Sequence, residues 1–383
     1  MLLVISGISA MISIIGAGIC GLSIGWYLAR AGQKVKIFDQ GQSAKQASWA
    51  SAGMLASNIE SEPGEERLLP LLIESRSLWD EFVTLLESDS KLPVSISKHG
   101  TLAVALNSDD KKIIEHAFRY KTSLGLELEL LSGKDIRKIE PHLSPKVCLG
   151  MHSVSDSFVD SRLILKALRI AFSKAGGELY ENNKVEEITV RNNQVNAIIV
   201  NGQKVSSNFV IVAAGAWSGK IKGILEEVKL PVRPVKGQML LVQMEKKNLR
   251  LDHAIWSPRI YLVPKTNSRL YIGATVEEKN FNEQITAGGM HDLLRFAYEL
   301  LPGIYDLEIT EMTSGLRPAS RDDAQILGPL KFNNSIIEGL ILATGHHRNG
   351  ILLAPITAKS ISHYILKGEL LECIRPFSFD RFL

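Results

Sequence analysis

A glycine-rich turn near the start of the chain restricts the possible folds more than any other feature of the sequence. The apolar run of residues 12–15 breaks into Gly16-Ala17-Gly18-Ile19-Cys20-Gly21, and a helical pattern follows until Gly32 ends it. Residues 35–39 then have the composition of a second strand. A strand, a GxGxxG turn, a helix and a second strand within roughly 30 residues form the unit that binds dinucleotides.

Each glycine of this turn has its own steric reason. Gly16 permits the tight turn, Gly18 lets the backbone approach a pyrophosphate, and Gly21 lets helix and strand pack closely. The helix that begins at about Ile19 points its N–H groups and positive dipole end at the phosphates. Asp39 ends the second strand, where an acid hydrogen-bonds ribose hydroxyls and, without a nearby arginine, disfavours NADP. The motif predicts a dinucleotide and leaves FAD and NAD open.

Length and charge narrow the class of protein. The chain has 383 residues, more than one typical domain, so we expect two domains that share a cleft. Its 44 Lys and Arg against 41 Asp and Glu are close to balanced. This balance gives no reason to expect nucleic acid or a membrane surface as a partner. No apolar stretch is long enough to span a bilayer.

The cysteines and the first residues bear on the compartment. Cys20, Cys148 and Cys373 lie far apart, and an odd, sparse set favours a reduced compartment, without a disulfide framework or a metal site. Residues 1–10 (MLLVISGISA) are apolar but lack a basic segment. We interpret them as a short extension, or as a start placed too early with Met11 as the true start, rather than as a signal peptide. The cytoplasm is the expected location.

The order of patterns along the chain indicates interleaved domains. Helical periodicity is expected at 65–87, 109–121, 161–175 and 352–366, and strands at 100–106, 185–188, 195–200, 209–212 and 340–343. Residues 231–309 have the pattern of a run of alternating strand-like segments. Dinucleotide-type units therefore occur at the start, middle and end, with β-rich segments between them. The predicted fold class is α/β (α+β overall).

Three further segments carry a resemblance to a known family. They are SWASAGM at 48–54, VIVAAGAW at 210–217 and GHHRNGILLAP at 345–355. They resemble the D-amino-acid oxidase superfamily, and within it they are most similar to the glycine oxidase family of thiamine biosynthesis. The similarity runs from Met11 to the tail PFSFDRF at 376–382. It implies a Rossmann-like FAD-binding domain of residues 11–90, 150–228 and 312–383, and a β-rich substrate-binding domain of residues 91–149 and 229–311.

The resemblance also implies how FAD is held. Related sarcosine oxidases tether their flavin through a cysteine near the C-terminal turn, whereas Cys373 lies well past that turn and Cys20 lies in the phosphate turn, so we expect non-covalent FAD. Small residues at 47–53 let the backbone run beside a flat ring system. The strand-turn-helix at 345–352 would present N–H groups to the flavin pyrimidine edge, where a positive dipole end stabilises the anionic reduced flavin.

The residues expected to bind the cofactor come from these segments and from Val185, which matches a residue whose backbone meets the adenine in relatives. An ordinary small-residue loop, a core valine and a helix without a ligand remain the alternative interpretations. The full set is Gly16, Gly18, Ile19, Cys20, Gly21, Asp39, Gln40, Ser48, Ala50, Ser51, Ala52, Gly53, Met54, Val185, Ala214, Gly215, Trp217, Gly345, His347, Arg348, Asn349, Gly350, Ile351 and Leu352.

The substrate pocket is predicted from three residues. A free amino acid carries a carboxylate, which an arginine holds best in a bidentate pair. Arg317 and Tyr261 match the family's carboxylate-binding arginine and tyrosine, and Arg348 resembles a second pocket arginine that binds the amine side through its backbone or tunes the flavin. The alternatives are a surface ion pair for Arg317 and a packed strand residue for Tyr261.

Two positions depart from the family pattern, and a pair of histidines at 346–347 also needs an interpretation. Relatives often carry a histidine at the position of Arg259 and a methionine at that of Val276. Arg259 either adds a cation to the pocket mouth, which would favour acidic or N-carboxymethyl substrates, or is a solvated strand residue. We interpret His346 and His347 as turn residues packed near the flavin, since no further metal ligands stand at suitable spacing.

The implied activity is FAD-dependent oxidative deamination of glycine or another small primary or secondary amino acid. The imine then gives an oxo acid and ammonia or enters thiazole synthesis, and dioxygen is reduced to hydrogen peroxide. Alternatives are a D-amino-acid dehydrogenase with another acceptor, an oxidase of D-alanine, D-aspartate or sarcosine, and a non-catalytic flavin-binding subunit. The resemblance further suggests a homo-oligomer, a tetramer or a dimer.

Overall fold

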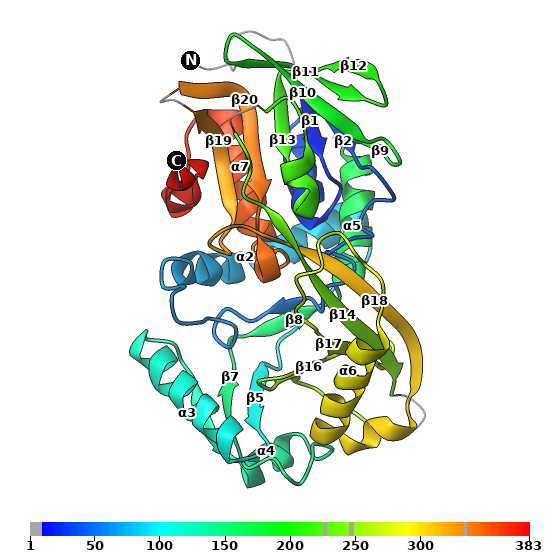
Figure 1. Ribbon diagram of the computed structural model, residues 1–383, viewed down its shortest axis with the longest axis vertical. Helices are drawn as coiled ribbons and strands as arrows, with labels where there is room; N and C mark the ends of the chain where they lie inside the picture. The colour runs from blue at the N-terminus through cyan, green and yellow to red at the C-terminus, as the bar shows by residue number, and fades with distance from the viewer. Residues whose placement is uncertain (1–9, 225–227, 245–248, 333–334) are drawn as a thin grey trace.

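Two large β-sheets organise the chain (Figure 1), and the computed structural model describes residues 10–224, 228–244, 249–332 and 335–383. Within these residues the first sheet has nine strands, and its main path runs β10-β11-β20-β13-β1-β2-β9. Its central neighbours, from β20 through β13, β1 and β2 to β9, are all parallel. The interpretation of residues 1–10 as an extension lies almost wholly outside the described residues.

The strands of the first sheet come from the start, middle and end of the chain. They are β1 (Met11–Ile15), β2 (Lys34–Phe38), β9 (Glu178–Tyr180), β10 (Val185–Arg191), β11 (Gln194–Val200), β12 (Gln203–Ser206), β13 (Phe209–Val212), β19 (Ile326–Phe332) and β20 (Ser335–Thr344). Because β1, β13 and β20 end at the same edge, the turns that follow them lie together. This is the edge at which open α/β sheets bind ligands.

Four helices pack against one another beside this sheet: α1 (Ile19–Arg30), α2 (Leu69–Ser90), α5 (Ser161–Lys174) and α7 (Ala354–Lys367). Their apolar faces form one core with β1 and β2, which includes Trp26, Trp79, Phe82 and Phe172, all at most 1% exposed. This parallel, helix-covered sheet confirms the predicted Rossmann-like fold class.

The second sheet has eight strands among the described residues, in the order β18-β14-β17-β16-β15-β5-β7-β6, and only the β5–β15 pair is parallel. Its strands are β5 (Thr101–Ala105), β6 (Glu129–Ser132), β7 (Leu149–Ser153), β14 (Arg233–Gln243), β15 (Ala254–Trp256), β16 (Tyr261–Lys265), β17 (Arg269–Gly273) and β18 (Glu308–Ala319). In Figure 1, β14 and β18 extend from this sheet toward the first one.

Alternation along the strands separates the two faces of the second sheet. Leu240, Val242, Leu262 and Ile272 share a core with α6 (Ala287–Leu300). Met239, Leu241, Val263 and Tyr271 point the other way and pack against Ala50, Ala52 and Met54. The second face therefore meets the small-residue segment that precedes β3 (Met54–Leu55), which pairs with β8 (Ser157–Val159) beside β4 (Ile96–Ser97).

The structure corrects the predicted elements in two places. The stretch 231–309 contains α6, whose buried Met290, Leu293, Ala297 and Leu300 follow helical spacing that the expectation of strands overlooked. The helix predicted from 352 begins at Ala354, after a separate 3₁₀ turn at His347–Asn349. By contrast, α5 and β13 match the predicted 161–175 and 209–212 within one residue.

The remaining helices are α3 (Ser108–Ser123), which packs on β5 and β7, and α4 (Gly133–Ile139). None of the helices among the described residues combines the length and apolar character needed to cross a bilayer. The predicted domain limits stay a prediction, and two of them, 149/150 and 311/312, fall inside β7 and β18.

Candidate active site

The glycine turn after β1 is built for close packing. Gly16 has a φ of +103°, in the region that favours glycine, and a Cβ there would overlap the backbone of Ala213. A Cβ on Gly21 would overlap the carbonyl oxygen of Gly16. Gly18 precedes α1 as its N-cap without a side-chain hydrogen bond, and the first turn of α1 contains no acidic residue. The positive end of the α1 dipole is therefore free of an intrinsic counter-charge, as a phosphate site requires.

Asp39 stands at the end of β2 beside this turn. Its carboxylate accepts hydrogen bonds from the N–H groups of Ala17 (2.8 Å) and Gly41 (2.9 Å), so it stabilises the turn as well as facing the cavity. Burial raises the pKa of the Asp39 carboxyl, and the two N–H groups oppose that shift. Its predicted contact with ribose hydroxyls stays a prediction.

One cavity of about 1320 Å³ begins at this turn and continues between the two sheets. Ligand pockets for a single drug-sized molecule measure ~300–1,000 Å³. This cavity is larger, as a dinucleotide together with a substrate would need. Its walls come from the turn after β1, the segment 46–54, the turn after β13, β16, β18 and the turn after β20.

The small-residue segment is held against the cavity by buried polar groups. The Tyr271 hydroxyl donates to the carbonyl oxygen of Ala50 (2.6 Å), and the Ser161 hydroxyl donates to that of Ser51 (2.8 Å). Lys265 donates to the carbonyl oxygens of Ala52 and Val159 (2.8 Å for Val159), and burial lowers the pKa of this lysine to about 7. The backbone is thereby fixed in a position where the side chains are too small to obstruct a flat ring.

Arg317 and Tyr261 lie farther along the cavity, on β18 and β16. The Arg317 Nη1 donates to the carbonyl oxygen of Thr275 (3.1 Å), and among the described residues no carboxylate forms an ion pair with it. A Cβ on Gly237 would lie 2.6 Å from the Arg317 Nη2, and one on Gly273 would lie 2.6 Å from the Tyr261 hydroxyl. Both side chains thus occupy space that two glycines of neighbouring strands leave open.

The Tyr261 hydroxyl keeps its proton. Burial raises the pKa of Tyr261, and the positive charge of Arg317 opposes that shift. A neutral phenol donates one hydrogen bond, and a guanidinium donates several in a planar fork. The pair therefore presents only donors and one positive charge to the cavity, which suits a carboxylate.

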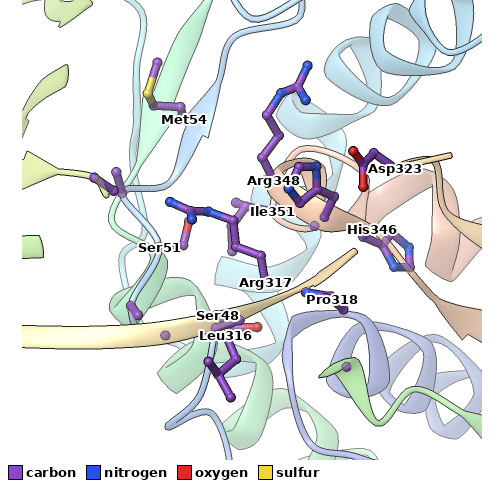
Figure 2. A pocket seen from close by; sticks show the side chains of 18 of the residues that line it. Ser48, Ser51, Met54, Leu316, Arg317, Pro318, Asp323, His346, Arg348 and Ile351 are labelled. Atoms are coloured by element: carbon purple, nitrogen blue, oxygen red, sulfur yellow. The ribbon is translucent and has the colours of Figure 1, made fainter. Parts of the chain in front are cut away.

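Among the described residues, the Arg348 side chain forms an ion pair, unlike the side chain of Arg317. Its Nη2 lies 2.5 Å from the Glu65 carboxylate and 3.1 Å from the carbonyl oxygen of Glu60. Figure 2 shows Arg317 extending toward Ser51 while the Arg348 side chain points in another direction. The guanidinium of Arg348 ties the turn after β20 to the segment 60–65, although Arg348 still lines the cavity. Its predicted backbone and flavin roles stay predictions.

Arg259 also lines the cavity but is paired. It contacts Asp110 (3.1 Å) and Glu299 (3.6 Å), and its guanidinium lies 5.4 Å from the centre of the Phe296 ring. Its charge is therefore balanced, which weakens the expectation of an extra cation at the pocket mouth. Val276 lines the same mouth with 75% of its surface exposed.

Of the two histidines of the last turn, His346 is buried and His347 is half-buried. Burial lowers the pKa of His346 to about 4 and that of His347 to about 4. His346 contacts the Cys20 sulfur (3.6 Å) and the Thr357 hydroxyl (3.1 Å), so it joins the last turn to the phosphate turn. Burial also raises the pKa of Cys20 to about 12, which leaves an unreactive thiol.

Most of the predicted residues meet in this one cavity. Those that line it are Gly16, Gly18, Ile19, Cys20, Asp39, Gln40, Ser48, Ala50, Ser51, Ala52, Gly53, Met54, Val185, Ala214, Gly215, Trp217, Tyr261, Arg317, His347, Arg348, Gly350 and Ile351. Four do not: Gly21, Gly345, Asn349 and Leu352. Gly21 packs helix against strand, and the carbonyl oxygen of Leu352 accepts hydrogen bonds from Ser75 and Trp79 of α2.

Sequence reasoning missed a group of ionisable residues around 58–61. Glu60 lines the cavity, Lys121 is 4% exposed and Asp156 is fully buried. Lys121 had a visible signal, because it follows Ile114, Ala117 and Phe118 at helical spacing and so occupies the apolar stripe of α3. Glu60 had none, since it stands in an irregular segment without periodicity.

The residues present fit FAD. The glycine turn and the start of α1 suit the pyrophosphate, Asp39 and Val185 line the nearer end, and the small-residue segment leaves room for a flat ring beside Arg317. Such a cofactor would be held by backbone groups and small side chains. None of the cysteines is placed to tether it: the Cys20 thiol is inert, and Cys148 and Cys373 do not line the cavity.

Comparisons with known proteins agree with this geometry. Residues 11–364 match the model of the family described as FAD dependent oxidoreductase. The chain is 29% identical to a glycine oxidase of Geobacillus kaustophilus over 97% of this chain and 96% of that protein. It is 33% identical to the bifunctional protein ThiO/ThiG of Synechocystis sp. over 97% of this chain, but it spans only 54% of that longer protein.

Solved structures of glycine oxidases are similar to this chain over nearly its whole length. The crystal structure of glycine oxidase from Geobacillus kaustophilus superposes with a TM-score of 0.90 at 28% identity, covering 98% of this chain and 100% of that one. Glycine oxidase from Bacillus cereus gives a TM-score of 0.85 at 30% identity, covering 94% and 96%.

Proposed function

The chain belongs to the family of FAD-dependent oxidoreductases, and from that premise we propose that it oxidises glycine or another small primary or secondary amino acid. The products are the imine, which hydrolyses to an oxo acid and ammonia, and hydrogen peroxide. The similarity to glycine oxidases over nearly the whole chain supports glycine as the first substrate to test.

One observation carries the proposal. Arg317 presents a guanidinium without a carboxylate partner among the described residues, beside the neutral Tyr261, in the cavity that begins at the dinucleotide turn. Leaving a charge unpaired in a cleft is unfavourable unless a ligand completes the pair. A substrate carboxylate bound by both side chains would complete it.

The residues of this chain would act mainly by orientation. FAD, when bound, supplies the acceptor for the hydride that leaves the substrate Cα. Arg317 and Tyr261 would fix the substrate carboxylate, so that the remaining bonds of Cα have one orientation. The segment 47–54 would keep the backbone close to the flat ring, and the apolar walls from Met54, Met239 and Ile351 would exclude water.

The proposal also covers the electron acceptor, the fate of the imine, the oligomeric state and the location of the protein. Dioxygen is the proposed electron acceptor, and delivery of the imine to thiazole synthesis for thiamine rests on the family resemblance and on the similarity to the protein named ThiO/ThiG. A homo-oligomer, a tetramer or a dimer, is proposed by the same resemblance. The cytoplasm is proposed because the three cysteines are free thiols.

The test follows the flavin directly. Purified holoenzyme is mixed with glycine, sarcosine, D-alanine and D-aspartate, and flavin bleaching is followed without air and oxygen uptake with air. We expect glycine to bleach the flavin and to drive rapid oxygen uptake with peroxide formation. Bleaching with negligible oxygen uptake would indicate a dehydrogenase. No bleaching by any of the four would contradict an amino-acid substrate.

A further inference from the structure

Among the described residues, Glu60 is an unpaired, half-buried acid of the cavity. Glu60 lines the same cavity as Arg317 and Tyr261. Within the part of the chain that the structure describes, its carboxyl group forms neither a hydrogen bond nor an ion pair. Its charge is nevertheless felt at the site, because it acts on Tyr261 and is itself acted on by Arg317.

The backbone around Glu60 is held tightly, which leaves the carboxyl as the free group of the segment. Asp156 accepts hydrogen bonds from the N–H groups of Asn58 (3.0 Å) and Ile59 (3.0 Å). The buried Lys121 ammonium donates to the carbonyl oxygens of Asn58 (3.0 Å), Ile59 (3.0 Å) and Ser61. Two buried charged groups thus hold the backbone on both sides of Glu60.

Glu60 itself is fixed by its own main chain. Its N–H donates to the carbonyl oxygen of Ala56 (3.1 Å), and its carbonyl oxygen accepts from the Arg348 Nη2 (3.1 Å). Arg348 is held in turn by Glu65 at 2.5 Å. Such a framework places a carboxyl reproducibly in the pocket, and it is more than a surface acid needs.

Several charges surround this carboxyl. Burial raises the pKa of Glu60 to about 7, and the neighbouring acids act in the same direction while the arginines oppose it. The groups that face it are Arg348, Asp156, Glu62 and Arg317, together with Lys121 and Tyr261, on which it acts. A carboxyl in this range changes its charge near neutral pH.

We propose that Glu60 recognises the ammonium group of the amino-acid substrate and accepts its proton before oxidation. This inference rests on the proposed function and deepens it. The pocket then presents a complementary charge to each end of a zwitterion, with Arg317 and Tyr261 for the carboxylate and Glu60 for the ammonium. Arg317 needs an anion and Glu60 needs a cation, and one small amino acid supplies both.

The proton step is balanced without any redox partner. One N–H bond of the substrate ammonium breaks and one O–H bond forms on the Glu60 carboxylate, so a cation and an anion become two neutral groups. The electron pair left on the amine nitrogen is what forms the C=N bond when hydride leaves Cα. Glu60 returns its proton to solvent after the product leaves. A base whose pKa lies near the working pH is efficient at such a transfer.

The test compares Glu60→Gln with Glu81→Gln, which removes the same charge from an exposed residue of α2 that does not line the cavity. In the holoenzyme, kcat/KM for glycine is measured from pH 5.5 to 10. The Kd of acetate, a carboxylate without an amine, is measured from the change it causes in flavin absorbance. Wild type should lose kcat/KM as the pH falls through about 7, because protonated Glu60 no longer attracts the ammonium.

For Glu60→Gln we expect kcat/KM for glycine to fall roughly 10- to 150-fold, the range for a lost hydrogen bond to a charged group. Its acid limb near neutral pH should disappear, and the deficit should narrow at pH values where free glycine already carries a neutral amine. Acetate should bind as tightly as to wild type or more tightly, because a like charge has been removed. Unchanged acetate binding also shows that the variant is folded. Glu60→Asp should keep the acid limb, and Glu81→Gln should behave as wild type.

The outcomes separate the two proposals. Glu60→Gln with the wild-type kcat/KM and pH profile, beside a wild type that oxidises glycine, would overturn the role of Glu60 alone. Equal losses of glycine and acetate affinity would also overturn it, since they would point to a collapsed pocket. A wild-type flavin that none of the four amino acids reduces would overturn the proposed function, and this role with it.

Discussion

The two ends of the cavity are lined by different kinds of groups. The end at the phosphate turn consists of backbone and small residues, where Gly16, Gly21 and Gly53 lack room for a Cβ. The other end consists of long side chains, in which Glu60, Tyr261, Arg317 and Arg348 come from four segments far apart in the sequence. The end at the phosphate turn therefore depends on positions without a side chain, and the other end depends on where charged side chains are placed.

This difference teaches which kind of substitution each end tolerates. At Gly16 and Gly21 of the phosphate turn an added Cβ meets backbone, which cannot move away, so the effect is steric and acts on folding and cofactor binding together. At the far end a side chain can be truncated without disturbing the strands, so the effect is electrostatic and acts on the substrate. Four predictions test this contrast, in order of decreasing effect.

Gly16→Ala should have the largest effect. The left-handed φ of +103° and the overlap with Ala213 together should destabilise the protein by about 2–5 kcal/mol, combining the usual costs of left-handed backbone and of overpacking. We expect a largely colourless protein with a lowered Tm. Gly41→Ala is the matched control, because a Cβ there meets nothing within 4 Å. A yellow, stable Gly16→Ala protein would contradict the steric account.

Arg317→Ala should abolish most of the activity and spare the cofactor. Losing the charged partner of the substrate carboxylate should raise the activation free energy for kcat/KM by about 2–4 kcal/mol. This lowers kcat/KM roughly 30- to 1000-fold, mainly through KM. The flavin spectrum should stay as in wild type. Arg321→Ala, at an exposed position close in sequence, controls for the lost charge. Unchanged kinetics would remove Arg317 from the pocket.

Arg348→Ala and Glu65→Gln should have smaller and similar effects, because both break the same ion pair, although Arg348→Ala also loses the hydrogen bond to the carbonyl oxygen of Glu60. We expect about 1–3 kcal/mol in stability for each, and a double variant little worse than either single one. Denaturant unfolding and glycine kinetics of the three variants measure this. If Arg348 instead touches substrate through its side chain, its variant would lose far more activity than Glu65→Gln.

Arg259→Ala should have the smallest effect. Its charge is balanced by Asp110 and Glu299, so it offers little to a substrate. We expect kcat/KM for glycine to change by less than roughly threefold and stability by about 1 kcal/mol, because Arg259 is itself exposed although its partner Asp110 is buried. The ratio of D-aspartate to glycine turnover is the sensitive readout. A selective loss of D-aspartate turnover would restore Arg259 as a cation for acidic substrates.

Much of the cofactor end could be predicted from local sequence. The turn Gly16–Gly21, Asp39 and the small residues at 48–54 each report a backbone requirement within a few residues, and all of them but Ala17 and Gly21 line the cavity. The error in the last turn was also local. Pro355 at the start of α7 suits the first turn of a helix, and the residues before it form a separate 3₁₀ turn.

The sequence by itself determined the parallel dinucleotide fold and predicted Arg317 and Tyr261 as the pair for the substrate carboxylate, because glycine spacing and family motifs lie along the chain. Only the tertiary structure decided which charges remain available. Arg259, Arg317 and Arg348 look alike as residues, yet Asp110, Glu299 and Glu65 neutralise two of them and leave Arg317 without a carboxylate among the described residues. Glu60 likewise was recognised as a cavity residue only from the tertiary structure. A charge is free or paired according to what folds against it, and those partners lie up to hundreds of residues away, as with Arg348 and Glu65, 283 positions apart.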